Sequence, residues 1–500
     1  MTLADLLMSI PDEAVHTLDA TVGRSELTDS ADSLCEALVQ LGLQPGQVVA
    51  AMLPNEPTTV AALFGTWRAA GVYTPLNPRT VDRELADLLE TLRPAVVLTT
   101  TALAHRFDTY RECGLHVITA DDLAWSVRPS PKPATELRSY DLGVALLQFT
   151  SGTTGRPKPV PLRHATVLDL IDRLLATLRG TTTRTSTKAP MPNVVPVSLS
   201  LWAGIYQILF AFRAGAGVVL MDRFSPQTFA ALVARYQIKS TVLPPAALTM
   251  ILQDDDVSDL VPLRIVRSIT APLSPVQGRR FKDRFGVIVL NSYGQTELGG
   301  EVVGWTTADA RAFGESKLGS VGRPLGGIDV EVQADEIMVR TPTTLARKVD
   351  PAFHDRLTDD GWFHTGDLGW FDDDGFLWLD GRVSDMINRG GLKVFPGQVE
   401  DVLLAAPTVR DAAVVGVPDD RLGEVPWAFV VSSGPSRDDA ALMAWCRERL
   451  TAYRIPARIV GIEVLPRNEM GKVVKRDLVA LAQQIREEEA AEPPRDEGKA

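Results

Sequence analysis

Short runs of apolar, β-branched residues alternate with helix-like stretches over the first three quarters of the chain. The run QVVAAMLP (47–54) predicts a strand, and TTVAALFGTWRAAG (58–71) has helical spacing and ends at glycine. Further strands are expected at AVVLTT, HVITA, GVALLQFT, GVVLM, STVLP and GVIVLNSYG, with helical patterns such as SPQTFAALVARYQI between them. Strands that alternate with helices indicate crossover units, so we expect an α/β fold with mixed, mainly parallel sheets.

The pattern changes near WFDDDGFLWLDGRVSD (370–385), where Asp-Asp-Gly between aromatic strands predicts a hairpin. Beyond it, PGQVEDVLLAAP and SRDDAALMAWCRERL predict helices, and RDAAVVGVPD and VPWAFVVSS predict strands. This is the pattern of a small α+β domain. We expect a large N-terminal domain over residues 1–383 and a small C-terminal domain over 384–485. Because REEEAAEPPRDEGKA is charged and contains proline, a disordered tail is expected over 486–500.

The composition narrows the class of protein. A chain of 500 residues exceeds one ordinary core, and 45% hydrophobic with 23% charged residues fits a soluble globular protein. The net charge of −12 disfavours a nucleic-acid partner. The three cysteines form no CxxC pair, which argues against zinc-ribbon or redox chemistry. Without a signal peptide or membrane-spanning run, a cytoplasmic enzyme with no membrane partner is expected.

The stretch TSGTTGRPKPVPLRH (150–164) has the composition of a phosphate-binding loop. Its glycines let the backbone approach an anion closely, and its hydroxyls can donate hydrogen bonds. It follows the apolar strand VALLQF, at the carboxyl end where open α/β sheets bind ligands. Gly152, Gly155 and Lys158 lack Walker A spacing, so an ordinary P-loop NTPase is not supported. Taken alone, the stretch also fits a surface turn.

Four more stretches follow this loop in a characteristic order: NSYGQTELGG (291–300), GSVGRPLGG (319–327), GWFHTGDLGWFDDDGFLWLDGRVSDMINRGGLKVFPGQVE (361–400) and PRNEMGKVVKRDL (466–478). Together the five resemble the motifs of the adenylate-forming (ANL) superfamily, which includes acyl-CoA synthetases, peptide-synthetase adenylation domains and luciferases. The resemblance covers about residues 25–480. The chain is identified as a member of the acyl-CoA synthetase, or acid–CoA ligase, branch.

This resemblance implies a two-step reaction. A carboxylic acid reacts with ATP to give an acyl-adenylate and pyrophosphate, and the thiol of CoA then displaces AMP. ATP, Mg²⁺ and CoA are the implied cofactors, and a small carboxylic acid and CoA are the implied partners. The residues implied to hold the β- and γ-phosphates are Thr150, Ser151, Gly152, Thr153, Thr154, Gly155 and Lys158.

The resemblance also assigns the catalytic residues. Thr296 would donate to the α-phosphate, and Glu297 would coordinate Mg²⁺, a hard cation that prefers oxygen ligands. Lys472 would reach the carboxylate and the α-phosphate as negative charge develops. The nucleoside would be held by Asn291, Tyr293 and Gly294 at the adenine, and by Asp367 and Arg382 at the ribose.

The C-terminal domain is expected to rotate between the two half-reactions. One orientation would deliver Lys472, and the other would bring NRGGLKV to the site. There Gly391 would leave room for a pantetheine arm, and Lys393 would support the thiol-reaction state or contact the cofactor. For His164, at the end of the first motif, a structural role is favoured over a position near the substrate.

Four positions depart from the family pattern. Pro159 replaces the usual glycine after Lys158, and proline removes a donor and fixes φ. SITAPL (268–273) places Ile269 and Thr270 where small residues are usual, PVSLSLWAG (196–204) lacks a histidine, and Ser384 occupies the hinge position. These changes lie on the adenylation half of the cycle. They leave open the hypothesis that this enzyme forms its own adenylate weakly and chiefly transfers to CoA an acyl-AMP made by a partner enzyme. Neutral variation within the family is the favoured interpretation.

The implied acyl pocket is SLSLWAGIYQ, SITAPL and YGQTELGGEVVG, with Trp202, Ile269, Gly294 and Gly299 as its lining residues. These segments contain no Lys or Arg, and Glu301 is their only extra acid. We therefore expect a neutral, lipophilic or aryl/alicyclic monocarboxylic acid. Two other hypotheses remain at this point: a separate carrier protein as the thiol acceptor, and a nucleotide-binding pseudoenzyme. The retained Thr296, Glu297, Asp367 and Lys472 argue against the pseudoenzyme.

Overall fold

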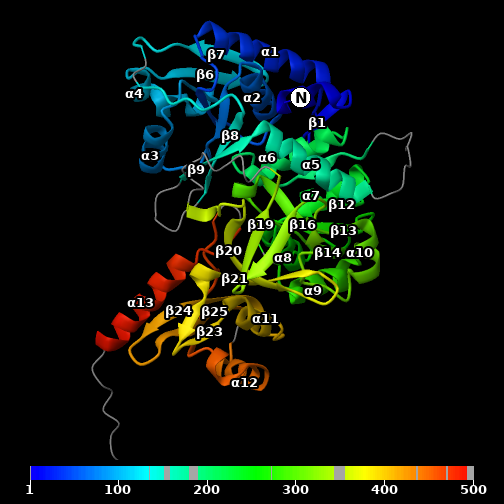
Figure 1. The fold of residues 1–500 in the computed structure, drawn as a ribbon, viewed down its shortest axis with the longest axis vertical. Coiled ribbons are helices and arrows are strands. Elements are labelled where there is room, and N and C mark those ends of the chain that lie inside the picture. Colours follow the sequence, from blue (N-terminus) through cyan, green and yellow to red (C-terminus); the bar gives the residue numbers. More distant parts are fainter. Residues whose placement is uncertain are drawn as a thin grey trace, which may run out of the picture.

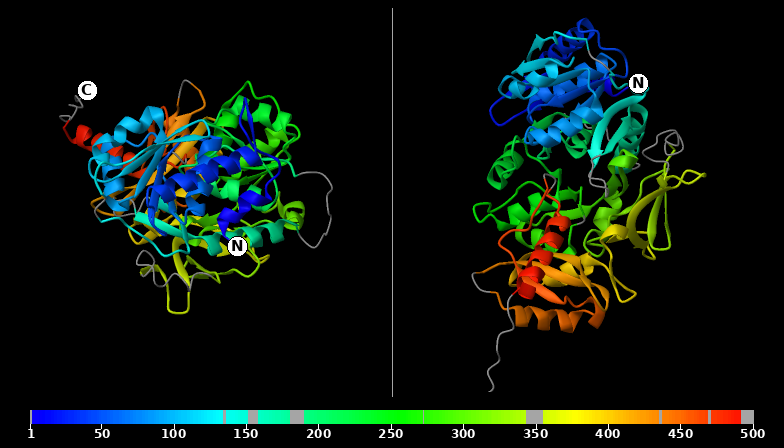
Figure 2. Two further views of the ribbon diagram at one scale, coloured as in Figure 1. Left: turned by 90° about the horizontal axis from the view of Figure 1, so that it is seen from above. Right: turned by 90° about the vertical axis from the view of Figure 1, so that its left-hand side faces the viewer.

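A computed structural model describes residues 2–133, 136–150, 158–179, 190–271, 273–342, 355–434, 437–468 and 471–491 (Figure 1). Within these ranges, the large N-terminal part and the small C-terminal lobe that the pattern predicts are both present. Figures 1 and 2 show the orange and red C-terminal lobe at one end of the molecule, beside the green elements and far from the blue N-terminal helices.

The first layer is a seven-stranded sheet whose centre is parallel. The predicted strands at 47–54, AVVLTT, HVITA and GVALLQFT are all confirmed, and the helix expected at 58–71 is α2 (Pro57–Arg68). Helices α1 (Arg24–Gln40) and α3 (Asp82–Leu92) belong to the same part of the chain. The strand order is β7 (Ala124–Arg128), β6 (His116–Asp121), β5 (Val96–Thr100), β3 (Val48–Met52), β4 (Val72–Pro75), β8 (Val144–Thr150) and β9 (Lys158–Arg163).

The second layer carries the strand ends that lead into the site. Its three parallel strands are β12 (Ser240–Leu243), β13 (Ile265–Ser268) and β14 (Ile288–Asn291), with helices α7 (Pro226–Arg235), α8 (Pro245–Gln253) and α9 (Pro275–Phe285) between or beside them. A four-stranded sheet has the order β10 (Asn193–Val195), β11 (Val218–Leu220), β1 (Glu13–His16) and β2 (Thr21–Gly23). Because β12, β13 and β14 pair in parallel, the chain leaves all three strands at the same edge of their sheet.

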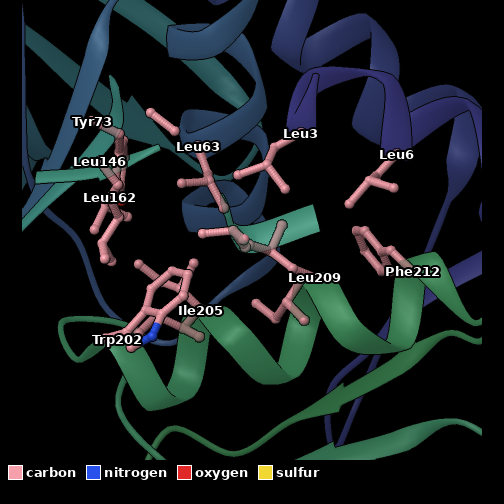
Figure 3. Packing of buried hydrophobic residues seen from close by; sticks show 14 of the residues in the cluster. Leu3, Leu6, Leu63, Tyr73, Leu146, Leu162, Trp202, Ile205, Leu209 and Phe212 are labelled. Atoms are coloured by element: carbon pink, nitrogen blue, oxygen red, sulfur yellow. The ribbon is translucent and has the colours of Figure 1, made fainter. Parts of the chain in front are cut away.

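Helix α6 (Trp202–Arg213) joins the layers through one apolar face. Trp202, Ile205, Leu209 and Phe212 recur at helical spacing and are nearly fully buried. Figure 3 shows these side chains directed toward Leu63 and its neighbours. Burial of a large apolar side chain contributes about 1.5–3 kcal/mol to the free energy of folding, so these four residues stabilise the packing of α6 by several kcal/mol. Helix α5 (His164–Arg179) follows β9 and packs beside α6.

An antiparallel sheet then carries the nucleotide motif. It comprises β18 (Asp329–Gln333), β19 (Glu336–Arg340), β20 (Phe363–Phe371) and β21 (Leu377–Arg382). The hairpin predicted at Asp-Asp-Gly is confirmed as the β20–β21 turn, where Gly375 has φ +76° and Asp372 accepts from two backbone N–H groups. The short strands β15 (Tyr293–Gln295), β16 (Gly300–Gly304) and β17 (Arg323–Pro324) form a separate sheet.

The C-terminal lobe has a core of its own, since its two hydrophobic clusters contain only residues between 387 and 485. It contains β22 (Ile387–Arg389), β23 (Leu392–Val394), α11 (Pro396–Leu404), β24 (Val409–Asp419), β25 (Gly423–Ser432), α12 (Asp439–Arg449), β26 (Arg458–Gly461) and α13 (Lys475–Ala491). This separate core supports a C-terminal domain beginning near residue 384, which remains our proposal for the boundary.

The predicted disordered tail is wrong for residues 486–491, because α13 continues to Ala491. Leu478 and Ala482 are fully buried against the β24–β25 face, and Ile485 packs against the same cluster. This apolar stripe fixes the helix, and the charged run is its solvated face. The rest of the expected tail, residues 492–500, lies outside the described residues.

Candidate active site

Asp367 is the centre of the site. It lies on β20 directly opposite Arg382 on β21, and the Arg382 Nε donates to its Oδ1 at 3.0 Å. The Tyr293 hydroxyl and the Gln295 Nε2 donate to Oδ2 at 2.8 and 2.5 Å. Only 7% of Asp367 is exposed. A buried carboxylate needs such donors, and they fix its orientation for a polar ligand.

Tyr293 and Asn291 come from the chain that leaves β14. Tyr293 is buried, and burial together with the Asp367 charge raises the pKa of its hydroxyl well above the usual value, so it stays a donor. The Asn291 Nδ2 donates to the carbonyls of Leu273 and Gly319 at 3.2 and 3.4 Å. Its buried Oδ1 has no partner among the described residues, which leaves an acceptor for a ligand donor.

The glycines predicted here have structural reasons. A Cβ on Gly294 would lie 2.1 Å from the carbonyl oxygen of Gly300, so the β15–β16 strands approach too closely for any side chain. Gly299 ends η3 (Thr296–Leu298) with φ +88°, in the left-handed region that favours glycine. These two glycines allow the tight turn that presents Thr296 and Glu297 beside Tyr293.

Glu297 is partly exposed and lies beside Arg356, a residue that the motifs did not indicate. The Arg356 Nη1 is 3.3 Å from the Glu297 Oε1, and its Nη2 is 3.2 Å from the Gln295 Oε1. A single carboxylate suits Mg²⁺, which is often held by one or two carboxylates plus substrate phosphates. The described residues contain no larger cluster of metal-ligating side chains. Glu297 therefore fits the metal as one ligand beside the nucleotide.

Lys472 comes from the C-terminal lobe and lies near enough to this cluster to feel its charges. Burial and Arg382 lower the pKa of its ammonium group, while Asp367 and Glu297 oppose that change. Its neighbour Gly471 has φ +72°, and a Cβ there would lie 2.2 Å from the Cβ of Ala246 in α8. The lobe is thus docked in the orientation that directs Lys472 toward the site.

The other predicted lobe residues are directed elsewhere. Lys393 donates to Asp335 at 3.0 Å, in the turn between β18 and β19. Gly391 has φ +88°, and a Cβ there would meet no atom within 4 Å. Ser384 lies in η6 (Val383–Asp385), exposed, and donates to the neighbouring Asp385. The structure therefore groups Lys472 with Asp367 and leaves Gly391 and Lys393 outside that group.

Most of the predicted phosphate loop, Ser151, Gly152, Thr153, Thr154 and Gly155, lies outside the described residues. Its flanks are described: Thr150 pairs with Lys158, and Phe149 with Pro159, where β8 and β9 close the hairpin. Strand β9 is at the sheet edge, so Pro159 costs no hydrogen bond to a second neighbouring strand. His164 accepts from the backbone N–H of Leu3, a structural contact in agreement with the favoured prediction.

The predicted acyl pocket contains a charged pair that its segments did not reveal. Arg267, just before SITAPL, donates to Glu301, and both side chains are almost fully buried. Trp202 is buried in the main core against Tyr206, and Ile269 follows β13. The pocket segments themselves contain no Lys or Arg, but Arg267, one residue outside them, places a cation beside Glu301.

The fold and these converging motifs define a nucleotide-dependent ligase. Residues 11–344 match the AMP-binding enzyme family, and residues 398–472 match the AMP-binding enzyme C-terminal domain. The chain therefore belongs to the AMP-binding enzymes, in the acyl-CoA synthetase branch of the adenylate-forming superfamily. It is an ATP-dependent acid–CoA ligase by class. Within the described ranges, no helix is both long and apolar enough to cross a membrane.

Its relatives cover nearly the whole chain. An oxalate–CoA ligase of Arabidopsis thaliana is 31% identical over 95% of this chain and 97% of its own. A 3-[(3aS,4S,7aS)-7a-methyl-1,5-dioxo-octahydro-1H-inden-4-yl]propanoyl:CoA ligase of Mycobacterium tuberculosis is 32% identical over 95% and 97%. The ATP-bound MatB structure from Rhodopseudomonas palustris, 25% identical, has a TM-score of 0.82 over 97% of this chain and 100% of that chain.

Proposed function

We propose that this chain joins a neutral, lipophilic or aryl/alicyclic monocarboxylic acid to CoA through an acyl-adenylate. The observation that carries the proposal is the convergence of three distant segments on one carboxylate cluster. Asp367 and Arg382 come from the β20–β21 hairpin, Glu297 from η3, and Lys472 from the C-terminal lobe. A vicinal diol suits the acceptor oxygens of Asp367, and a lysine suits the anionic carboxylate and phosphate.

In the first half-reaction, a carboxylate oxygen of the acid attacks the α-phosphorus of ATP, and the bond to the pyrophosphate oxygen breaks. Thr296 donates to the α-phosphate, and Lys472 neutralises charge that grows on the carboxylate and phosphate. Mg²⁺, held by Glu297, supplies further charge neutralisation when bound. Asn291 and Tyr293 hold the adenine, and the loop from Thr150 to Lys158 holds the outer phosphates. These are the roles that we propose for the predicted residues.

In the second half-reaction, the CoA sulfur attacks the acyl carbon, and AMP leaves with the electron pair of the acyl–phosphate bond. We propose that the lobe over 384–485 rotates for this step, which withdraws Lys472 and brings Gly391 to the thiol path. The Lys393–Asp335 pair must break in that rotation, and at about half exposure each it presents a small barrier.

The substrate proposal rests on the Arg267–Glu301 pair. Because the two charges are opposite and in contact, the pair has no net charge to offer an additional anionic group. The relatives include ligases for oxalate and sulfoacetate as well as for a bicyclic propanoate. Of these, the bicyclic acid has the uncharged, lipophilic body that we expect here.

The test is a panel of carboxylic acids, with AMP release measured in the presence and absence of CoA. We expect the best activity with lipophilic or aryl/alicyclic monocarboxylates and little with oxalate or sulfoacetate. Preference for a dianionic acid would overturn the substrate class, and no CoA-dependent product with any acid would overturn the function. Replacing CoA by a pantetheine-loaded carrier protein tests the alternative acceptor, and added acyl-AMP tests the alternative of transfer without efficient adenylation.

A further inference from the structure

Among the described residues, Arg356 is a cation that contacts Glu297 and lies outside all of the recognised motifs. Its guanidinium is clamped by neutral acceptors: Nε donates to the His364 carbonyl at 2.9 Å, and Nη2 to the Thr365 carbonyl at 2.8 Å. The ring of Phe363 lies beneath it, 4.4 Å from the guanidinium carbon. These contacts fix the orientation of the guanidinium plane, so that its Nη1 edge is held toward Glu297.

The Nη1 edge has hydrogen-bond donor capacity that the described residues do not fill. Nη1 carries two N–H groups, and the single contact that it makes among the described residues is the long one, 3.3 Å, to Glu297. A charge-assisted hydrogen bond at full strength is shorter, about 2.7–2.9 Å. The side chain of Arg356 is 34% exposed. A rigidly held cation therefore keeps donor capacity on the side of the carboxylate that is expected to bind metal.

The network around Arg356 gives its place along the nucleotide. Gln295 donates to Asp367 and accepts from Arg356, and Arg356 in turn contacts Glu297. These contacts form a series that begins at Asp367, the proposed ribose ligand, continues through Gln295 and Arg356, and ends at Glu297, the proposed metal ligand beside the phosphates. Helix η3, which holds Glu297, also packs against β9, the strand that begins at Lys158. The Nη1 edge lies at the phosphate end of this series.

We propose that Arg356 is a further phosphate-binding residue, which donates from Nη1 to the β- and γ-phosphates of ATP and to departing pyrophosphate. This inference rests on the proposed nucleotide site. When the carboxylate oxygen bonds to the α-phosphorus, the electron pair of the broken bond stays on pyrophosphate, and Arg356 neutralises part of that charge. It also holds Glu297 in place before the nucleotide arrives. Planar guanidinium groups suit phosphate because they present parallel donors.

The test compares binding of inorganic pyrophosphate, ATP and AMP by calorimetry, with and without Mg²⁺. In Arg356→Gln we expect affinity for pyrophosphate and ATP to fall about tenfold or more, the value of one or more charge-assisted hydrogen bonds, while AMP affinity changes less than about twofold. Arg356→Lys retains charge without the fork and should lose less. Because these are equilibrium measurements, they read binding independently of turnover.

Arg284 provides the matched control. It donates to three backbone carbonyls, those of Leu252, Asp254 and Val257, where Arg356 donates to two, and it likewise lies over a phenylalanine ring, that of Phe285. Its side chain contacts no carboxylate among the described residues. Arg284→Gln should therefore lose comparable structural contacts, which thermal unfolding measures, without altering pyrophosphate affinity.

Two results would overturn the inference. Unchanged pyrophosphate and ATP affinities in a folded Arg356→Gln protein would remove the phosphate contact. An equal loss for AMP would show that Arg356 only supports the Asp367 framework. Both outcomes leave the proposed function standing, because the wild-type protein would still bind AMP. If the wild type binds neither AMP nor ATP, the nucleotide site itself is wrong and the inference falls with it.

Discussion

Gly471 controls how closely the C-terminal lobe can approach the nucleotide site. It immediately precedes Lys472, has φ +72°, and packs on Ala246 so tightly that a Cβ would lie 2.2 Å from the Ala246 Cβ. Carbon atoms in contact are ordinarily about 3.5–4.0 Å apart, so Gly471→Ala must move the lobe by more than roughly 1 Å. The left-handed backbone adds about 1–2 kcal/mol for any side chain.

The expected effect follows from these two costs. A displacement of about 1 Å at a reacting group typically costs on the order of 10² in rate. We therefore expect Gly471→Ala to slow acid-dependent exchange of pyrophosphate into ATP by about 10²-fold, because Lys472 no longer reaches the forming adenylate. Transfer of preformed acyl-AMP to CoA should change little, since that step needs the other lobe orientation.

Two controls separate the clash from backbone strain. Gly423→Ala places a side chain at φ +77° in the same lobe, but its nearest neighbour, the Asn388 carbonyl oxygen, is at an ordinary 3.6 Å. It should leave exchange intact. Ala246→Gly removes the opposing Cβ and should restore part of the exchange rate in Gly471→Ala. The reasoning fails if folded Gly471→Ala exchanges pyrophosphate at the wild-type rate, or if both half-reactions decline equally.

Three further predictions concern the departures from the family pattern and the lobe interface. Thr270 has φ +76° and a buried hydroxyl without a partner among the described residues, so Thr270→Gly should raise the free energy of unfolding by about 1 kcal/mol in a denaturant titration; a lower value would show that the threonine is held by contacts we have not recognised. Pro159→Gly should alter pyrophosphate exchange by less than about threefold because the proline lies on an edge strand, whereas a tenfold gain would favour the weak-adenylation alternative. Asp401 lies on α11, and burial raises the pKa of its carboxyl to about 6, although a hydrogen bond from Ser274 opposes this change. Folding therefore favours the protonated carboxyl over the ionised one. As pH rises from about 4, the usual pKa, through about 6, the Asp401 carboxyl must ionise in its buried position, and the free energy of unfolding falls. Asp401→Asn should therefore raise Tm more at pH 7.5 than at pH 5, and an equal shift at both values would contradict the buried carboxyl.

The structure also explains why residues 486–491 are helical rather than disordered. Residues 486–491 carry the charge expected of a disordered tail, yet they extend α13. Composition sums over all positions, whereas a helix is stabilised by the few that meet a partner surface. Leu478, Ala482 and Ile485 supply that face, and the β24–β25 sheet that covers it lies more than 40 residues earlier in the chain. Glu487, Glu488 and Glu489 are exposed, and Glu489 pairs with Arg458, so the helix buries none of these charges.

The sequence by itself determined the alternating α/β elements, the β20–β21 hairpin, and the local turns that hold Asp367, Thr296 and Glu297. Each of these depends on periodicity or on residues a few positions apart, so a linear pattern contains it. Only the tertiary structure decided that Arg356 meets Glu297 across 59 residues and that Arg267 neutralises Glu301 across 34. The lobe orientation was decided in the same way, through contacts such as Gly471 on Ala246. Long-range pairs of this kind arise from how separate elements pack, and no local spacing encodes which charges will face each other.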